Sequence, residues 1–211
     1  METTAVFEDS IDLTRLTAPG LVLDVAGGGE GIVGKVLGRR VVSIDLSLAE
    51  LQEASNDALK MVGDAAALPF LDGSFDEATC FFGLMYMPVD SLPSVFAEAY
   101  RVLRPGGRLR VWDVNMRERS FIIGLKVHTS KATLSTGYGV YSPDRRQTIM
   151  QIEDLAAGAG FVTLGRAGTA HTFHLSLLKP YAVDASMPQL AAIVPIAAGD
   201  MQIVRASAAD V

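Results

Sequence analysis

The chain has 211 residues, of which 49% are hydrophobic and 20% charged, and its formal net charge is −6. This composition is typical of one ordered globular domain and excludes a disordered protein, while the acidic balance disfavours a general nucleic-acid binder. The single cysteine, Cys80, excludes a disulfide framework and a thiolate metal cluster, and we predict no metal site.

Strand and helix patterns alternate from about residue 21 to residue 114. Strands are predicted at 21–26, 41–45, 59–63, 75–82 and 108–114. Helices are predicted at 31–38, 47–57 and 91–103. The second of these begins with Ser47 and Glu50, which have the spacing of a capping box. Alternating units of this kind build a parallel sheet with helices on both faces.

The regular rhythm is lost between residues 115 and 148. Strands are predicted there at 121–126 and 132–140, with a turn at 136–139, where Tyr138 stands between two glycines. A helix at 151–159 and strands at 161–164 and 171–179 follow. We predict one domain over residues 1–180, and an alanine-rich extension, 181–211, that packs on this domain or lies at an interface.

The most informative segment is residues 21–31, where an apolar run containing Asp24 breaks into four glycines. A buried strand, a glycine turn and a helix start allow a ligand to lie against bare backbone. Residues 29–34 match the dinucleotide fingerprint G-x-G-x-x-G, which alone is a weak signal. Asp45 ends the second strand, where a carboxylate can accept hydrogen bonds from ribose hydroxyls. Nicotinamide dinucleotides and S-adenosylmethionine both contain such a ribose, so Asp45 does not separate them.

Other features favour a positively charged adenosine ligand. Asp24, just before the loop, suits a positively charged ligand, or a loop whose amides need an acceptor, better than a pyrophosphate. Asp64 follows the third strand and could accept a hydrogen bond from an adenine amine, while the Ala65 amide donates to the ring. The chain has no Tyr-x-x-x-Lys pair, which a short-chain dehydrogenase would use.

The chain resembles the class I S-adenosylmethionine-dependent methyltransferases through five segments in the family's order: 22–31, 44–47, 63–70, 72–76 and 98–107. The resemblance is close over residues 21–114 and looser over 151–179. It implies an α/β fold with a doubly wound, mostly parallel seven-stranded sheet, a Rossmann-like methyltransferase fold whose last strand is antiparallel. It also implies S-adenosylmethionine as the cofactor, and methyl transfer to a small-molecule acceptor by in-line displacement.

The resemblance assigns roles to residues of this chain. Those for the cofactor are Asp24 and the loop amides around Gly27, Gly29 and Gly31 for the methionine part, Asp45 for the ribose, Asp64 and Ala65 for the adenine, and Leu46 and Phe81 for packing against the adenosine. Without a gap, Ala26 and Glu30 stand where the family usually has glycine. A shift by one residue restores Gly27-x-Gly29-x-Gly31, and we favour this register.

Candidates for the acceptor pocket are Tyr86, Asp113, His128 and Tyr138. Each has a structural alternative: Tyr86 as pocket wall or core, Asp113 as a strand cap, His128 as a surface histidine, and Tyr138 as a turn residue. No catalytic base is assigned, because a sulfonium methyl is already activated and a base is needed only for a protonated acceptor.

Two other functions remain open on the sequence. A non-catalytic partner subunit or ligand sensor of the same fold is suggested by Glu30 in the loop and by the alanine-rich extension. A nicotinamide-dependent oxidoreductase is the third hypothesis. We expect a small-molecule substrate, no nucleic-acid or membrane partner, and a cytoplasmic location, since no signal peptide or membrane-spanning pattern is present. A homodimer is one assembly that the sequence leaves open.

Overall fold

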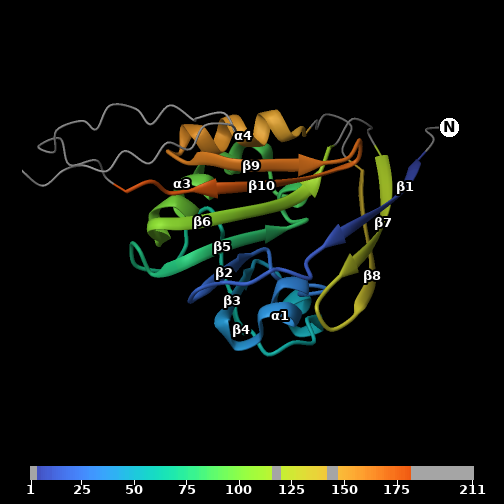
Figure 1. Cartoon of the computed structure of the whole chain (residues 1–211), viewed down its shortest axis with the longest axis horizontal. Coiled ribbons are helices and arrows are strands. Elements are labelled where there is room, and N and C mark those ends of the chain that lie inside the picture. The colour runs from blue at the N-terminus through green and yellow to red at the C-terminus, as the bar shows by residue number, and fades with distance from the viewer. Residues whose placement is uncertain (1–3, 116–119, 142–146, 182–211) are drawn as a thin grey trace, which may run out of the picture. The chain divides into compact units, whose positions relative to one another are not determined.

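The computed structural model describes residues 4–115, 120–141 and 147–181, which form two β-sheets and their flanking helices (Figure 1). The larger sheet has seven strands in the order β4-β3-β2-β5-β6-β10-β9. In chain order these are β2 (Val22–Val25), β3 (Val41–Asp45), β4 (Leu59–Val62), β5 (Phe75–Phe81), β6 (Leu103–Val114), β9 (Val162–Gly168) and β10 (Thr172–Leu178).

Strand β10 runs antiparallel to both of its neighbours, β6 and β9, while the other neighbouring strands pair in parallel. This confirms the predicted doubly wound, mostly parallel sheet of seven strands with the last strand antiparallel. The carboxyl ends of β2, β3, β4, β5 and β6 therefore meet at one edge, which is where ligands bind in open α/β sheets.

The predicted helices are present as α1 (Ile32–Leu37), α2 (Leu48–Glu53), α3 (Leu92–Val102) and α4 (Ile149–Gly158). Helix α2 ends four residues earlier than predicted. The amide of Asn56 donates to the Gly31 carbonyl at 2.9 Å, and its Oδ1 accepts from the Ala58 backbone at 3.0 Å. Such local side-chain bonds compete with helix continuation. None of the described helices is both long and apolar enough to cross a membrane.

Hydrophobic cores lie on both faces of the large sheet. On one face α3 and α4 pack against apolar strand residues such as Leu23 and Ala78. The opposite face carries Val22, Phe81 and Trp112, which pack with α1, with residues 11–18 and with the smaller sheet. This arrangement buries both faces, as a mostly parallel sheet requires.

The smaller sheet has the strand order β1-β7-β8, with β1 (Ala5–Asp12), β7 (Ser120–His128) and β8 (Thr133–Tyr141). Strand β1 was not predicted, whereas the two strands between residues 115 and 148 were. In Figure 1 this sheet lies beside the end of the large sheet at which β5 and β6 finish.

The predicted turn at residues 136–139 is wrong, because these residues lie within β8. The chain instead reverses at 129–132, where the Thr129 amide donates to the Ala132 carbonyl at 2.9 Å. The Thr129 hydroxyl accepts from the Lys131 and Ala132 amides at 3.2 and 3.0 Å. A threonine can thus form the reversal without glycine, and Tyr138 becomes a mid-strand residue.

The helix predicted to end at residue 103 ends at Val102, and residues 104–107 are part of β6, into which the chain continues directly. Here the Gly106 amide donates to the Lys179 carbonyl at 2.8 Å, and the Lys179 amide to the Gly107 carbonyl at 2.9 Å. The predicted extension lies outside the described residues apart from Tyr181, so its packing stays a prediction.

Candidate functional site

The glycine loop between β2 and α1 lies at the carboxyl edge of the large sheet. Gly29 and Gly31 have positive φ angles of 56° and 53°, and so does Ala26, at 56°. An alanine in this left-handed region costs roughly 1–2 kcal/mol relative to the right-handed region. The backbone therefore favours glycine at position 26, which is the family position that the sequence comparison found occupied by alanine.

Gly27 and Gly28 are required for space. A Cβ atom on Gly27 would lie 2.6 Å from Asp24 Oδ2, and one on Gly28 would lie 2.8 Å from Asp45 Oδ2. Both distances are shorter than real carbon contacts allow. The loop thus packs directly on two carboxylates, and any side chain at these positions would displace them.

Three of the loop amides that the resemblance assigns to the cofactor donate within the protein. Gly27 donates to the Ile44 carbonyl at 3.2 Å, Gly29 to the Glu50 carbonyl at 2.8 Å, and Gly31 to the Gly28 carbonyl at 3.1 Å. In this structure the glycines therefore let neighbouring side chains pack against the loop, and their amides hold the loop together.

Asp45 is fixed at the end of β3 by two backbone amides. Its Oδ2 accepts from Gly28 at 3.2 Å and its Oδ1 from Ser47 at 2.9 Å. Because each carboxylate oxygen has further acceptor capacity, Asp45 can still accept from ligand hydroxyls. Leu46 beside it is 70% exposed and offers an apolar surface.

Glu50 is a site residue that the sequence reading missed. The Ser47 hydroxyl accepts from the Glu50 amide at 3.2 Å, which is half of the predicted capping box. The Ser47 amide donates to Asp45, so this partner of a capping-box glutamate is already taken. A Cβ on Gly29 would lie 2.8 Å from Glu50 Oε2, so the Glu50 carboxylate lies against the loop.

Asp24 lies beneath the loop and is 2% exposed. The Thr79 hydroxyl donates to its Oδ1 at 2.7 Å. Ser43 occupies the same register position on β3, and its buried Oγ has no hydrogen-bond partner among the described residues. Burial raises the pKa of Asp24 to about 7; the Thr79 bond opposes this shift and the Asp45 charge adds to it. The Asp24 carboxyl group thus lies directly against the loop, where it leaves no space for a side chain at Gly27.

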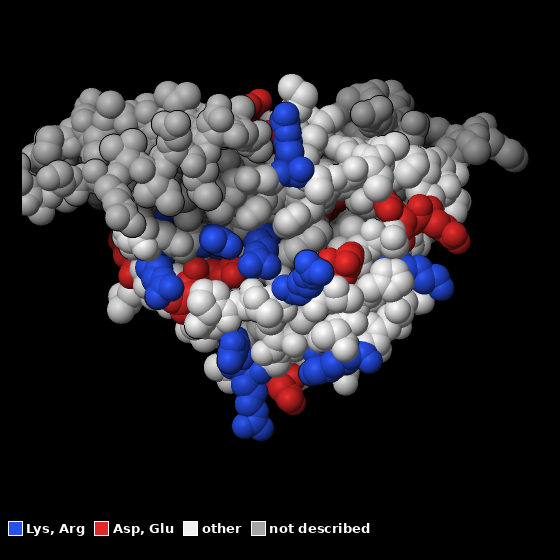
Figure 2. Space-filling model, viewed as in Figure 1, with Lys and Arg blue, Asp and Glu red and all other residues white. Residues whose placement is uncertain are grey.

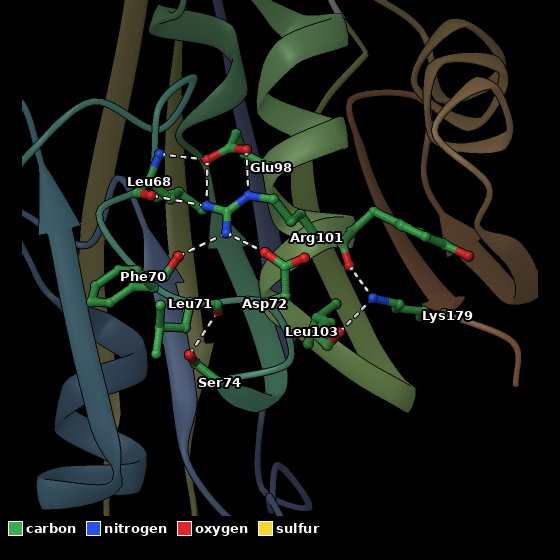
Figure 3. Close-up of polar contacts among 10 residues, drawn as sticks. Leu68, Phe70, Leu71, Asp72, Ser74, Glu98, Arg101, Leu103 and Lys179 are labelled. Carbon is green, nitrogen blue, oxygen red and sulfur yellow. Dashed lines mark hydrogen bonds and ion pairs between the residues drawn. The ribbon is translucent and has the colours of Figure 1, made fainter. Parts of the chain in front are cut away.

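The adenine residues stand at the end of β4. Asp64 is exposed, and its Oδ1 accepts from the Ala66 amide at 2.8 Å. The connection from β4 to β5 continues past Asp64 and is anchored by Arg101. The Arg101 guanidinium donates to the Leu68 and Phe70 carbonyls and to the carboxylates of Glu98 and Asp72 (Figure 3). The assignment of Asp64 and Ala65 to adenine stays a prediction.

Phe81 differs from its expected setting. It is 7% exposed and packs between Phe82, at a ring-centroid distance of 4.9 Å, and Trp112, at 5.9 Å. It belongs to the core below the smaller sheet. Its packing against an adenosine stays a prediction, while its role as core is what the structure shows.

Tyr86 and Tyr138 meet above the carboxyl end of β5. The Tyr86 hydroxyl donates to the Gly139 carbonyl at 3.3 Å, and the Tyr138 ring stacks on Phe82 at 4.9 Å. Burial raises the pKa of both phenols. The charges of Glu30 and Asp24 raise the pKa of Tyr138 further.

Asp113 is fully buried at the end of β6, where it joins three segments. Its Oδ2 accepts from the Leu84 amide at 2.9 Å and the Met85 amide at 3.3 Å, and its Oδ1 accepts from Gln147 at 2.9 Å. Burial raises the pKa of Asp113 to about 6 despite these bonds. This favours the structural alternative, because the carboxylate holds in place the 3₁₀ turn Leu84–Tyr86 that carries Tyr86.

The three histidines do not contact Tyr86, Tyr138 or Asp113 in any of the interactions described here. His128 is exposed at the far end of β7, with its Nδ1 2.9 Å from the Thr133 hydroxyl. His171 stacks on Phe7 and His174 on Trp112. Among the described residues, no three His, Cys, Asp or Glu side chains gather in a way that could hold a metal ion.

Comparison with known proteins agrees with this geometry. A family profile described as a methyltransferase domain matches residues 23–111. The ubiquinone/menaquinone biosynthesis C-methyltransferase UbiE of Dinoroseobacter shibae is 47% identical over 105 residues, covering 44% of this chain and 41% of the relative. The chloroplastic 2-phytyl-1,4-beta-naphthoquinone methyltransferase of Arabidopsis thaliana is 32% identical over 148 residues, covering 62% of this chain and 56% of the relative.

Solved structures share the fold at lower identity. A crystal structure of an S-adenosylmethionine-dependent methyltransferase from Methanosarcina mazei superposes with a TM-score of 0.57 at 17% identity, covering 78% of this chain and 94% of that one. The chain spans only about two fifths to three fifths of the curated relatives named above. The profile and the relatives show that residues 23–111 are similar to a methyltransferase domain, and the strand order and the solved structure share the fold of class I S-adenosylmethionine-dependent methyltransferases.

Proposed function

We propose that this chain transfers a methyl group from S-adenosylmethionine to a small-molecule acceptor by in-line displacement. The observation that carries the proposal is the position of Asp45. Two amides fix it at the carboxyl edge of the sheet, between the glycine loop and the exposed Leu46. This arrangement suits a ribose held by its hydroxyls with an adenine laid on an apolar side chain.

The acidic groups around the loop suit a cationic ligand. Asp24 lies under the loop, while Asp45 and Glu50 lie against it. The sulfonium and the ammonium of S-adenosylmethionine are both positive, whereas the pyrophosphate of a nicotinamide dinucleotide would meet these three carboxylates unfavourably. The electrostatics therefore favour the sulfonium cofactor.

When bound, this cofactor supplies an activated methyl group, so the chain mainly has to align the acceptor and exclude water. Tyr86 and Tyr138 are placed for this task, since they close the side of the site above β5. Both phenols are protonated near neutral pH and so do not serve as bases there, and the Tyr86 hydroxyl already donates to the Gly139 carbonyl at 3.3 Å. An acceptor that is already nucleophilic fits this arrangement. The named relatives act in quinone biosynthesis, which makes phenolic and quinol-like molecules the first acceptors to test.

Titration calorimetry with S-adenosylmethionine, S-adenosylhomocysteine and NADH tests the cofactor assignment. We expect micromolar binding of both sulfur compounds and none of NADH. Asp45→Ala should weaken sulfur-ligand binding by about tenfold or more, because hydrogen bonds to a charged group are worth roughly 1.5–3 kcal/mol. The matched control is Asp57→Ala, which removes an exposed carboxylate one residue past the loop partner Asn56.

The second function to consider is the non-catalytic partner subunit or ligand sensor, which the sequence suggested through Glu30 and the alanine-rich extension. Glu30, which suggested this alternative, pairs with Lys35 at 3.1 Å. A panel of phenols and quinols with a labelled methyl donor separates the two functions. Label transfer supports the enzyme, while sulfur-ligand binding without transfer to any member of a broad panel would favour the sensor.

We further propose that the protein acts in the cytoplasm on a free small molecule, without a nucleic-acid partner. On the face shown in Figure 2, Lys and Arg side chains are interspersed with Asp and Glu, a mixture that gives no uniform basic surface. A homodimer stays a prediction that sedimentation analysis can test.

A further inference from the structure

The side chain of Glu50 lies along the glycine loop, and backbone bonds fix the point from which it starts. The Ser47 hydroxyl accepts from the Glu50 amide at 3.2 Å, and the Glu50 carbonyl accepts from the Gly29 amide at 2.8 Å. A Cβ atom on Gly28 would lie 2.6 Å from Glu50 Cβ, and one on Gly29 would lie 2.8 Å from Glu50 Oε2. The Glu50 side chain therefore runs from Gly28 to Gly29, the part of the loop that packs on Asp45.

The Glu50 carboxylate keeps its capacity to accept hydrogen bonds. The residue is exposed, and no hydrogen bond or ion pair in the part of the chain that the structure describes uses this carboxylate. The Ser47 amide, its partner in a complete capping box, donates instead to Asp45 at 2.9 Å, and Lys35 pairs with Glu30. Because an ionised carboxylate has about four acceptor positions, Glu50 can accept from a ligand without losing a contact of its own.

Asp45 and Glu50 flank the same point of the loop. The position that a Cβ atom on Gly28 would take lies 2.8 Å from Asp45 Oδ2 and 2.6 Å from Glu50 Cβ. Glu50 Oε2 lies beside Gly29, one residue further along the loop, and consecutive Cα atoms are about 3.8 Å apart. Two carboxylates thus stand side by side at the carboxyl edge of the sheet, one held by backbone amides and the other exposed.

A ribose matches this pair of carboxylates better than a cationic group does. The 2′ and 3′ hydroxyls of a ribose stand on adjacent carbon atoms, so each can donate to one of two neighbouring carboxylates. Hydrogen bonds to an ionised acceptor are about twice as strong as neutral ones. The attraction between an exposed carboxylate and a sulfonium or ammonium group is screened by water and salt. The hydroxyls are therefore the groups of the cofactor that suit Glu50.

We propose that Glu50 is a second ribose-binding residue, whose carboxylate accepts from one ribose hydroxyl while Asp45 accepts from the other. This inference rests on the proposed function, and it adds a residue and a specificity to the cofactor site. It makes both hydroxyls necessary for full affinity, so the site discriminates against adenosine ligands in which either hydroxyl is missing or substituted.

Titration calorimetry of the full chain with S-adenosylmethionine and S-adenosylhomocysteine tests the role of Glu50. Glu50→Ala removes the carboxylate, while Glu50→Gln removes the charge but keeps an oxygen that accepts. Glu53→Ala is the matched control, because Glu53 is also exposed and ends the same helix. We expect Glu50→Ala to bind both sulfur compounds about tenfold more weakly, Glu50→Gln to lose at most about threefold, and Glu53→Ala to equal wild type.

The 2′-deoxy and 3′-deoxy analogues of S-adenosylhomocysteine show whether the contact is direct. Glu50→Ala should weaken the binding of one analogue about tenfold and leave the other, which lacks the hydroxyl that Glu50 binds, unchanged. An equal loss for both analogues would overturn the proposal. A Glu50→Gln variant as weak as Glu50→Ala, or a loss confined to S-adenosylmethionine, would also overturn it, because Glu50 would then act through its charge.

The same titrations separate this inference from the proposed function. Equal binding of the sulfur compounds by wild type and Glu50→Ala would remove Glu50 from the site and leave the proposed function intact. Absence of binding of both compounds to wild type would instead refute the proposed function.

Discussion

Tyr138 lies flat on Phe82, with ring centroids 4.9 Å apart and an interplanar angle of 5°. Phe82 has a positive φ angle of 55°, which is uncommon for a bulky residue, and its amide donates to the Trp112 carbonyl at 2.7 Å. This stack, together with the Tyr86–Gly139 bond, fastens the smaller sheet over the carboxyl edge of the large one.

We predict that the ring of Tyr138, and not its hydroxyl, supplies most of this fastening. Tyr138→Leu should lower the free energy of unfolding by about 1–2 kcal/mol, because a stacked aromatic pair adds roughly 0.5–1.5 kcal/mol to the burial of its area. Tyr138→Phe should stay within about 0.5 kcal/mol of wild type. Urea unfolding measures both, and an equal loss in the two variants would assign the effect to the hydroxyl.

Ala26 supplies a second prediction, because its positive φ angle disfavours any residue with a Cβ atom. Ala26→Gly relieves a strain of roughly 1–2 kcal/mol but adds about 0.5–1 kcal/mol of backbone entropy loss on folding. The net result should be a gain of up to about 1 kcal/mol. Ala49→Gly in helix α2 is the control and should lose about 1 kcal/mol. Thermal melts of the two variants that moved in the same direction would contradict the left-handed assignment.

The large sheet could be predicted because each strand–helix unit carries its own local signals, such as the capping box of Ser47 and the apolar strand that ends at Asp45. The smaller sheet depends on distant pairing, since β1 joins β7 only through contacts such as Ala5 with Phe121. Asp9 faces inward on β1, which breaks the apolar alternation, and the threonines that satisfy it lie far away in the sequence.

The site was predictable to a similar extent. The positions of Asp24 and Asp45 followed from the strand ends, but that the adjacent Phe81 and Phe82 both lie in the core could not be read from an apolar run. Glu50 was missed because the sequence assigned it to a helix cap. The signal that could have found it was its place one turn into the helix that follows Asp45.

The anchor formed by Arg101 leads to a third prediction (Figure 3). Its guanidinium donates to two backbone carbonyls and to the carboxylates of Glu98 and Asp72, at 2.7–2.9 Å. The Arg101 side chain is 31% exposed, so solvent screens part of this network. Arg101→Ala should lose about 1–3 kcal/mol of stability.

Arg101→Lys should recover little of that loss, because a lysine cannot reproduce the planar fork of donors. The control is Arg166→Ala, since Arg166 is 64% exposed and makes an ion pair at 3.3 Å with Glu153. That variant should change stability by less than about 0.5 kcal/mol in urea unfolding. Equal effects of Arg101→Ala and Arg166→Ala would show that the network does not anchor the β4–β5 connection.

We predict that the negative charge of Asp24 lowers the stability of the folded chain but strengthens the binding of a cationic ligand, and that both effects depend on pH. Burial raises the pKa of Asp24 to about 7, from an ordinary value of 3.8. In the window between these two values the folded state binds more protons than the unfolded state, so the contribution of Asp24 to stability falls as pH rises through it. At pH 8 the buried charge costs at most about 4 kcal/mol. Asp24→Asn can still accept the Thr79 hydrogen bond but carries no charge.

Asp24→Asn should therefore melt at a higher temperature than wild type at pH 8, and this advantage should vanish near pH 4. The same variant should bind S-adenosylmethionine more weakly at pH 8, because the negative charge beneath the loop is lost. Thr79→Val, which removes the hydroxyl that donates to Asp24, is the comparison and should raise the pKa of Asp24 further. An Asp24→Asn protein that is less stable than wild type at both pH values would mean that the carboxylate is ionised and well solvated in the folded chain. Burial would then not raise the pKa of Asp24 beneath the glycine loop.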